Sequence, residues 1–237
     1  MKVFLINLDT NIARFAVADR QLKQLGVDYE RFPAVYGKAM SEAERKEAVN
    51  GFRWWCAIGR PIAPAEIGCA LSHYRIYQRM VEEEIPYICI LEDDVVLKPA
   101  FGAQLDFIAS QLDVTLPQVV LLSNHTAERC ETQCIKVARA DMFTEGYVIT
   151  KPAAKALLKA NLPIQVPCDH WGRWVKRGVI QLYHAFPTVA TQDQVTFASS
   201  TSEGRVNPNT LSRYAYFCHK VKRAFGRSLD IALEWLA

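Results

Sequence analysis

The sequence lacks any uninterrupted apolar run of about 18 residues, the length that a membrane-spanning helix needs. Glycine and proline are also scarce, at 11 residues each among 237, which excludes collagen-like and low-complexity chains. The first apolar run stops at Asn7 and Asp9, too early for the core of a secretion signal. Half of the residues are hydrophobic and 22% are charged. We therefore expect a globular protein of the cytoplasm.

Paired cysteine spacings are largely missing as well. The seven cysteines are odd in number and dispersed, which indicates reduced thiols rather than a disulfide framework. Cys130 and Cys134 stand close together in the sequence, but no second pair at metal-binding spacing accompanies them. Their spacing alone therefore does not predict a zinc site.

Strand and helix patterns alternate along most of the chain. Buried-strand patterns occupy residues 2–8, 29–36, 87–91, 119–122, 147–150 and 179–183. Helical patterns occupy residues 11–25, 64–80, 101–112, 151–160 and 169–177. We expect the aromatic segment 51–61 to be a loop. The alternation predicts a single α/β domain over residues 1–198, with a mostly parallel sheet flanked by helices.

The last forty residues differ in charge from the rest. Six basic residues and no acidic ones lie between Arg205 and Arg227, so subtracting them from the net charge of +3 leaves −3 elsewhere. Apolar residues recur every three or four positions after Thr210, which predicts a basic amphipathic helix after a linker within residues 199–237. Such a helix fits an anionic inner-membrane surface. Alternatively, it packs on the catalytic domain with a solvated basic face. No nucleic-acid recognition motif accompanies the charge, so we expect no nucleic-acid partner.

Three adjacent acids, Glu92, Asp93 and Asp94, follow the buried strand pattern 87–91. Ligands collect at the carboxyl ends of strands in open α/β sheets, and clustered carboxylates are relieved by a hard divalent ion such as Mg²⁺ or Mn²⁺. Such an ion could stabilise a departing nucleoside diphosphate. The acids could equally cap the following turn or face water, and spacing alone does not separate these readings.

Four motifs occur together and in order. They are INLDxxxxR at residues 6–14, PAEIGCALSHYRIY at 64–77, ILEDDV at 90–95 and TEGYVITKPAAKALL at 144–158. Over residues 2–158, with a weaker extension through Asp169, the sequence resembles glycosyltransferase family 25. That family contains lipopolysaccharide and lipooligosaccharide glycosyltransferases, β-galactosyltransferases among them, and the related collagen galactosyltransferases.

The resemblance implies a GT-A-like fold, a UDP-sugar donor, most often UDP-galactose, and a divalent metal held by an acidic motif. By analogy Asp94 holds the metal, Glu92 binds the metal or the donor's ribose, and Asp93 stands between them at the donor site. In this interpretation the donor binds together with Mn²⁺ or Mg²⁺. The first position of the DxD motif is Glu rather than Asp in this sequence, so the separate roles of the three acids stay open.

Five further residues are candidates for donor binding: Asn7, Arg14, Gly68, Ser72 and His73. Asn7 and Arg14 leave the first strand at the same sheet edge as the acids, and they offer an amide and a phosphate-matching guanidinium. Gly68 permits close backbone approach, while Ser72 and His73 supply a hydroxyl and an imidazole. The competing interpretations are a solvated helix residue for Arg14, a helix crossing at Gly68 and a buried, hydrogen-bonded His73.

Displacement at the sugar needs a base that takes the proton of the acceptor hydroxyl. Asp169 in VPCDHW is the first candidate and Glu145 in TEGY the second. His170 is a further contributor and His184 a further metal ligand. Asp169 could instead cap a helix, Glu145 could be a loop acid and His184 a strand-end residue.

Aromatic residues provide a candidate acceptor site. The pair Trp54 and Trp55, flanked by Arg53 and Arg60, could stack on a sugar ring, although core packing is the commoner role of any one tryptophan. Trp171 and Trp174 have the same two interpretations.

Together these observations predict a transferase that moves a hexose, galactose above others, from a UDP-sugar to a lipid-linked saccharide of the lipopolysaccharide type. We expect it in the cytoplasm, peripheral on the inner membrane. The alternatives are a catalytically silent nucleotide-sugar or carbohydrate-binding module, and a metal-dependent phosphohydrolase that uses the same acids.

Overall fold

The fold is built on one seven-stranded sheet, seen in a computed structural model that describes residues 1–125, 130, 132–139 and 141–193. The strand order is β2-β1-β3-β7-β5-β8-β6. Pairing makes β1, β2, β3, β5 and β8 run in one direction, with β6 and β7 opposed to them. The predicted α/β class with a mostly parallel sheet is therefore confirmed. The strand bounds are β1 Lys2–Asn7, β2 Glu30–Pro33, β3 Tyr87–Glu92, β5 Gln118–Leu121, β6 Cys134–Ala138, β7 Gly146–Thr150 and β8 Gln181–Phe186.

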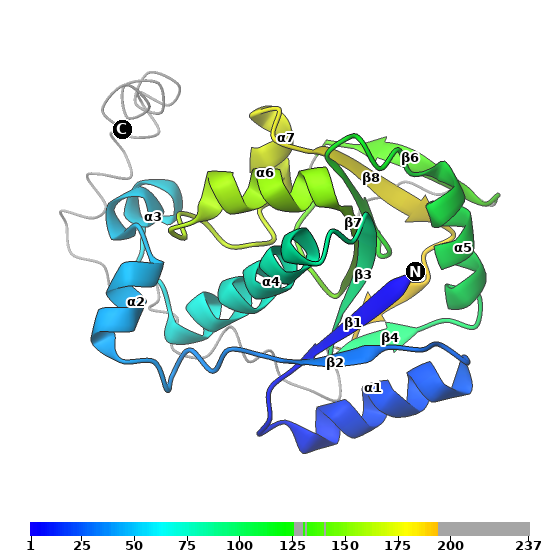
Figure 1. Cartoon of the computed structure of the whole chain (residues 1–237), viewed down its shortest axis with the longest axis horizontal. Helices are drawn as coiled ribbons and strands as arrows, with labels where there is room; N and C mark the ends of the chain where they lie inside the picture. Colours follow the sequence, from blue (N-terminus) through cyan, green and yellow to red (C-terminus); the bar gives the residue numbers. More distant parts are fainter. Residues whose placement is uncertain (126–129, 131, 140, 194–237) are drawn as a thin grey trace.

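Helices cover both faces of this sheet (Figure 1). One face packs against α1 (Ile12–Gln24) and α5 (Phe101–Gln111), and we call it the α1 face. The other packs against α4 (Pro64–Glu82), α6 (Lys151–Asn161) and α7 (Trp171–Lys176), and we call it the α4 face. The shorter helices α2 (Glu42–Ala48) and α3 (Gly51–Ile58) lie between β2 and α4 along the chain. Among the described residues, no helix is both long and apolar enough to cross a membrane.

Alternation along β3 decides which side chains meet which helices. Ile88 and Ile90 lie in the hydrophobic cluster of the α4 face, whereas Cys89 and Leu91 lie in that of the α1 face. Successive side chains of a strand point to opposite faces, so Glu92 continues the first set and Asp93 the second. The same alternation in β1 places Phe4 with the α4 face and Asn7 with the α1 face.

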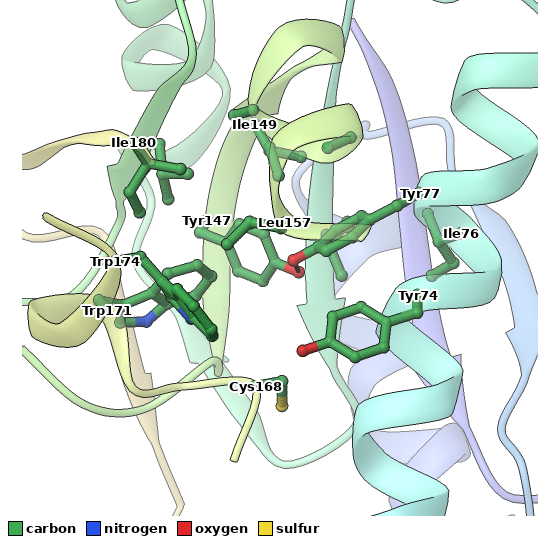
Figure 2. Packing of buried hydrophobic residues seen from close by; sticks show 14 of the residues in the cluster. Tyr74, Ile76, Tyr77, Tyr147, Ile149, Leu157, Cys168, Trp171, Trp174 and Ile180 are labelled. Carbon is green, nitrogen blue, oxygen red and sulfur yellow. Dashed lines mark hydrogen bonds between the residues drawn. The ribbon is translucent and has the colours of Figure 1, made fainter. Parts of the chain in front are cut away.

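The α4 face has an aromatic core (Figure 2). Tyr77 and Tyr147 meet with their hydroxyl oxygens 2.6 Å apart, and Tyr147 also packs edge-on against Trp171. Asn161 donates a hydrogen bond to the Tyr74 hydroxyl. Buried aromatic hydroxyls need such partners, because an unsatisfied polar group costs about 1–3 kcal/mol. The α4 face is therefore held by hydrogen bonds as well as by apolar packing.

The segment 51–61, predicted to be a loop, forms helix α3 instead. Asn50 accepts a hydrogen bond from the Arg53 N–H at 3.0 Å, which caps the helix, and Gly59 ends it with a φ of 79°. The prediction failed because the aromatic composition masked this cap signal. Helix formation turns Trp54 inward, where only 1% of it is exposed and its indole N–H donates to the Arg60 carbonyl at 2.9 Å. Trp54 therefore belongs to the core and cannot stack on a sugar in this arrangement.

A second, two-stranded sheet was not predicted. It pairs β4 (Val95–Leu97) with β9 (Ala190–Gln192) in antiparallel register, almost a hundred residues apart in sequence. This sheet starts immediately after the acidic triplet, so it ties the end of the described chain to that triplet. The basic helix predicted after Thr210 lies outside the described residues.

Candidate functional site

The candidate site lies where β1 and β3 end side by side. These neighbouring parallel strands pair Ile6 with Glu92, so Asn7 and Asp93 follow on the same face. Asn7 Nδ2 donates to Asp93 Oδ2 at 2.7 Å and to the Asn11 carbonyl at 3.1 Å. Asn7 Oδ1 in turn accepts from Arg31 Nε at 3.0 Å. The Asn7 amide is thus used inside the protein to fix Asp93.

Arg14, in the first turn of α1, supplies the positive charge of the site. Its Nη1 donates to Asp93 Oδ1 at 3.1 Å and to Asp94 Oδ2 at 3.3 Å. Arg14 is only 9% exposed, so it is not the solvated helix residue that the sequence left open. Buried carboxylates and a buried guanidinium compensate one another here, because an unpaired buried charge is costly.

The third acid, Glu92, faces the opposite way, toward α4. Its Oε1 lies 3.2 Å from His73 Nε2 and also accepts a hydrogen bond from the Thr144 hydroxyl. The other ring nitrogen of His73, Nδ1, lies 2.8 Å from the hydroxyl of Tyr147. His73 is buried and has a hydrogen-bond partner at each ring nitrogen, which agrees with the interpretation of a buried, hydrogen-bonded histidine. One of these partners is Glu92, so His73 also contacts the acidic triplet.

Ser72 and Gly68 mainly join α4 to the segment after β2. The Ser72 hydroxyl donates to the Gly68 carbonyl at 2.6 Å and accepts from the Val35 N–H at 2.8 Å. A Cβ atom on Gly68 would stand 2.3 Å from the Val35 carbonyl oxygen and 2.8 Å from the Gly37 nitrogen. Gly68 is therefore required for close backbone packing, whereas Ser72 also lines a cavity beside the acids.

The acids differ in their preferred charge state. Burial, with the charge of Glu92 adding to it, raises the pKa of Asp94 to about 7. Burial also raises the pKa of Asp93 despite its bonds to Asn7 and Arg14. Burial acts the same way on Glu92, but the bonds from His73 and Thr144 prevail and lower its pKa. Burial alone would lower the pKa of His73, yet Cys69 and Glu92 raise it to about 9.

A cavity of about 230 Å³ opens beside these groups. Ligand pockets usually measure about 300–1,000 Å³, so a nucleotide sugar would extend beyond its rim. Most of the predicted donor residues line it, but Gly68 does not. The cavity lining includes Asn7, Arg14, Tyr36, Lys38, Cys69, Ser72, His73, Glu92, Asp93, Asp94 and Gln192.

A divalent cation would fit this cavity through Asp94. Asp94 Oδ1 is buried and has no hydrogen-bond partner among the described residues, whereas both Asp93 oxygens are already occupied. Within the same residues, Glu92, Asp93 and Asp94 do not bring three ligand atoms within 4.8 Å of one another. Magnesium commonly binds through one or two carboxylates plus substrate phosphates, so a single open carboxylate is a plausible anchor.

The two candidate bases lie in different surroundings. Asp169 is half-buried just before α7, and its Oδ2 accepts from the Phe143 N–H at 3.4 Å. Burial raises the pKa of Asp169, and the charge of Glu92 acts in the same direction. Glu145 is only 2% exposed, and its Oε1 lies 2.6 Å from His125 Nε2. Neither residue lines the cavity, although both lie close in the fold to the end of β3.

His184 and the remaining tryptophans lie away from the acids. His184, on β8, is three strands from β3, about 14 Å across the sheet, and its Nε2 is 2.7 Å from Asp141 Oδ2. The structure does not place it with Glu92 or Asp94. Trp171 and Trp174 are fully buried in the α4 face, whereas Trp55 is half-buried.

Three contacts of the site were missed by the sequence. Gln192 donates to Asp94 Oδ2 at 3.1 Å, and β9 brings it there from far along the chain. Arg31 fixes Asn7, and Thr144 donates to Glu92. Thr144 belongs to the TEGY motif and could have been singled out, whereas nothing local in the sequence distinguishes Gln192.

Residues 1–171 match the model of glycosyltransferase family 25, described as an LPS biosynthesis protein. A glycosyltransferase 25 family member of Drosophila pseudoobscura pseudoobscura is 31% identical over 184 residues, which cover 71% of this chain and 29% of that protein. Human procollagen galactosyltransferase 2 is 28% identical, with coverage of 68% of this chain and 28% of that protein. The chain thus spans less than a third of the length of these relatives.

A bacterial relative matches over a greater share of both chains. A putative glycosyltransferase of Haemophilus influenzae is 24% identical over 238 residues, which cover 94% of this chain and 83% of that protein. The family model covers well over half of the chain and includes the ends of β1 and β3, α4 and Asp169. The chain belongs to glycosyltransferase family 25.

Proposed function

We propose that this protein transfers a hexose, galactose in the first instance, from a UDP-sugar to a saccharide acceptor of the lipopolysaccharide type. Family membership supports glycosyl transfer, and relatives named procollagen galactosyltransferases support galactose. The observation that carries the proposal is the open Asp94 carboxylate, which stands beside Arg14 in a cavity at the carboxyl end of the sheet.

In this function Asp94 holds a divalent cation, Mn²⁺ or Mg²⁺, which neutralises the charge that develops on the leaving UDP. Glu92, already bonded to His73 and Thr144, adds negative charge to the same region. Lys38 also lines the cavity and provides a cation for the donor phosphates. Tyr36, which is 47% exposed there, offers an aromatic face for the uracil ring.

Asn7 and Arg14 act on the donor through the acids. The Asn7 amide bonds to Asp93, Asn11 and Arg31, so we assign it the role of positioning Asp93. Arg14 balances the negative charges of Asp93 and Asp94 while no cation is bound. A bound cation would take over part of that task and leave the Arg14 guanidinium available to a phosphate oxygen.

Asp169 is the base that we assign to the acceptor hydroxyl. Burial raises its pKa, which makes its carboxylate a stronger base, and its side chain is half-buried rather than sealed. Glu145 is less suited, because His125 contacts its carboxylate and burial closes it from solvent.

The proposal is tested by calorimetric titration of UDP-galactose with and without Mn²⁺. Wild-type protein should bind the donor more tightly with Mn²⁺, and Asp94→Ala should lose that gain, a drop of at least about 100-fold, because it removes the open ligand. Asp106→Ala, which removes an exposed acid of α5, is the matched control and should bind as wild type. Equal Mn²⁺-dependent affinity in Asp94→Ala would refute the metal assignment.

The same assay separates the two bases. Asp169→Asn should keep donor affinity but reduce turnover by about 10²- to 10⁴-fold, the usual contribution of a general base. Glu145→Gln, the matched neutralisation of the other candidate, should change turnover far less. Nearly normal turnover in Asp169→Asn would remove it as the base. Donor binding without any transfer or hydrolysis in the wild type would instead support the silent binding module.

A further inference from the structure

A second group of potential metal ligands lies on the α4 face, apart from the carboxylates that point to Arg14. Cys69 and His73 are one turn apart on α4, and Cys168 comes from the segment before α7. Figure 2 shows Cys168 beneath the aromatic cluster, between that segment and α4. One ligand atom from each of the three residues lies within 4.8 Å of the other two. Within the described residues, this is the one such group of three.

The sulfur atoms stand at a spacing suited to zinc. Cys69 Sγ and Cys168 Sγ are 3.7 Å apart. Two thiolates bound to tetrahedral Zn²⁺ at about 2.3 Å each are separated by about 3.8 Å. The two sulfurs therefore need almost no movement to share one ion, and the distance from the His73 nitrogen to each sulfur needs to shorten by no more than about 1.2 Å.

We propose that Cys69, His73 and Cys168 form a Zn²⁺ site. Sulfur and imidazole ligands favour a borderline-soft ion such as Zn²⁺, whereas the oxygen of Asp94 favours a hard one, so the two sites differ in the cation that they select. Glu92, whose Oε1 is 3.2 Å from His73 Nε2, or a water molecule completes four-coordination.

The surroundings of His73 support this role. Metal-bound histidines usually have their other ring nitrogen held by a hydrogen bond, which fixes the orientation of the ring. Tyr147 provides that contact at 2.8 Å from Nδ1, and Tyr77 holds Tyr147 in turn at 2.6 Å. All three of these side chains are at most 1% exposed, so the ring is oriented before any ion arrives.

Occupation of the site would affect the cavity, because Cys69 and His73 both line it. Zinc would draw the His73 ring and the neighbouring Glu92 away from their metal-free arrangement. We therefore expect Zn²⁺ to inhibit sugar transfer, a consequence that rests on the proposed function. Zinc binding itself is measured without donor or acceptor, so its failure is distinguishable from failure of the proposed transfer.

The experiment uses the full chain with Cys130→Ser and Cys134→Ser, because those two sulfurs, 2.9 Å apart, form a competing pair. Cys218 stays in every variant. Titration with Co²⁺ alone should give one thiolate-to-cobalt absorption band, and competing Zn²⁺ should remove it. Adding Cys168→Ser should weaken Zn²⁺ binding at least about 100-fold, and adding Cys56→Ser, a half-buried cysteine of α3, should not.

The cobalt spectrum keeps the test independent of whether Cys168→Ser folds, since it is recorded on the parent protein. Absence of a thiolate band in the parent would overturn the proposal, as would equal Zn²⁺ affinity in folded Cys168→Ser. Recovery of a Cys69–Cys168 disulfide from parent protein held with equimolar Zn²⁺ in air would also overturn it, because oxidised sulfurs cannot ligate the ion in this way.

Discussion

The two faces of the sheet shift the pKa values of the acidic triplet in opposite directions. On the α4 face, Glu92 meets a histidine whose pKa is raised to about 9, and its own pKa is lowered. On the α1 side, Asp93 and Asp94 meet Arg14, yet burial raises the pKa of both. The surroundings thus favour the ionised form of Glu92 and disfavour the ionised forms of Asp93 and Asp94.

The difference shows where a cation is needed. A buried carboxylate with a raised pKa and an oxygen without a partner is stabilised by added positive charge, whereas Glu92 already has a partner. Strand alternation separates Glu92 from Asp93, and the turn formed by Asp93 and Asp94 after β3 leaves both aspartates in contact with Arg14. The three carboxylates therefore belong to two separate groups of contacts, Glu92 with His73 and the two aspartates with Arg14, rather than to one symmetrical metal site.

The largest expected effect follows from removing the positive charge of the α1 side. Arg14→Ala leaves Asp93 and Asp94 buried without their guanidinium, and loss of one partner of a buried ion pair costs about 3–5 kcal/mol. Urea unfolding at pH 8 in a chelator should show that loss. The loss should shrink at pH 5, because Asp94, with a folded-state pKa of about 7, is then protonated.

Arg20→Ala is the matched control for this change. Arg20 is an exposed arginine of the same helix, so its removal should alter the free energy of unfolding by no more than about 0.5 kcal/mol. A loss below about 1 kcal/mol in Arg14→Ala, or a loss independent of pH, would contradict the comparison between the two faces.

The elements that carry the two groups of contacts could be located from the sequence. The buried-strand patterns at residues 2–8 and 87–91 locate two parallel strands, and their carboxyl ends must meet at one edge. The helix from Pro64 carries His73 toward that edge. Local periodicity and neighbouring residues are enough for these placements, because each depends on a single element and its direction.

Other parts depend on contacts that no local pattern encodes. Gln192 reaches Asp94 through a strand pair that joins distant segments, and Cys168 meets Cys69 across 99 positions of sequence. The orientation of Trp54 depended on a helix that its aromatic composition concealed. Register between distant strands and packing between separate helices set these positions, and both require the folded chain.

A smaller effect tests the α4 face. Glu92→Gln keeps the size of the side chain but removes the negative charge beside His73, so burial should then lower the pKa of His73 from about 9. Because the folded-state pKa of wild-type His73 lies above the ordinary 6.5, its stabilising contribution is complete below pH 6.5 and is lost as the pH rises through 9. In metal-free protein, Glu92→Gln should therefore lose up to about 3 kcal/mol near pH 6, and the difference from wild type should shrink by pH 10.

Nuclear magnetic resonance of ring-labelled histidine measures this pKa directly, since the chain has only five histidines. Glu83→Gln is the matched control, because Glu83 is bonded to Arg79 and Lys2 outside the site, and it should leave the His73 titration unchanged. If wild-type His73 titrates near 6.5, Glu92 does not hold it protonated, and the electrostatic contrast between the two faces disappears. If His73 titrates near 9 in both proteins, Cys69 rather than Glu92 sets its charge, and the contrast must be assigned to the thiol.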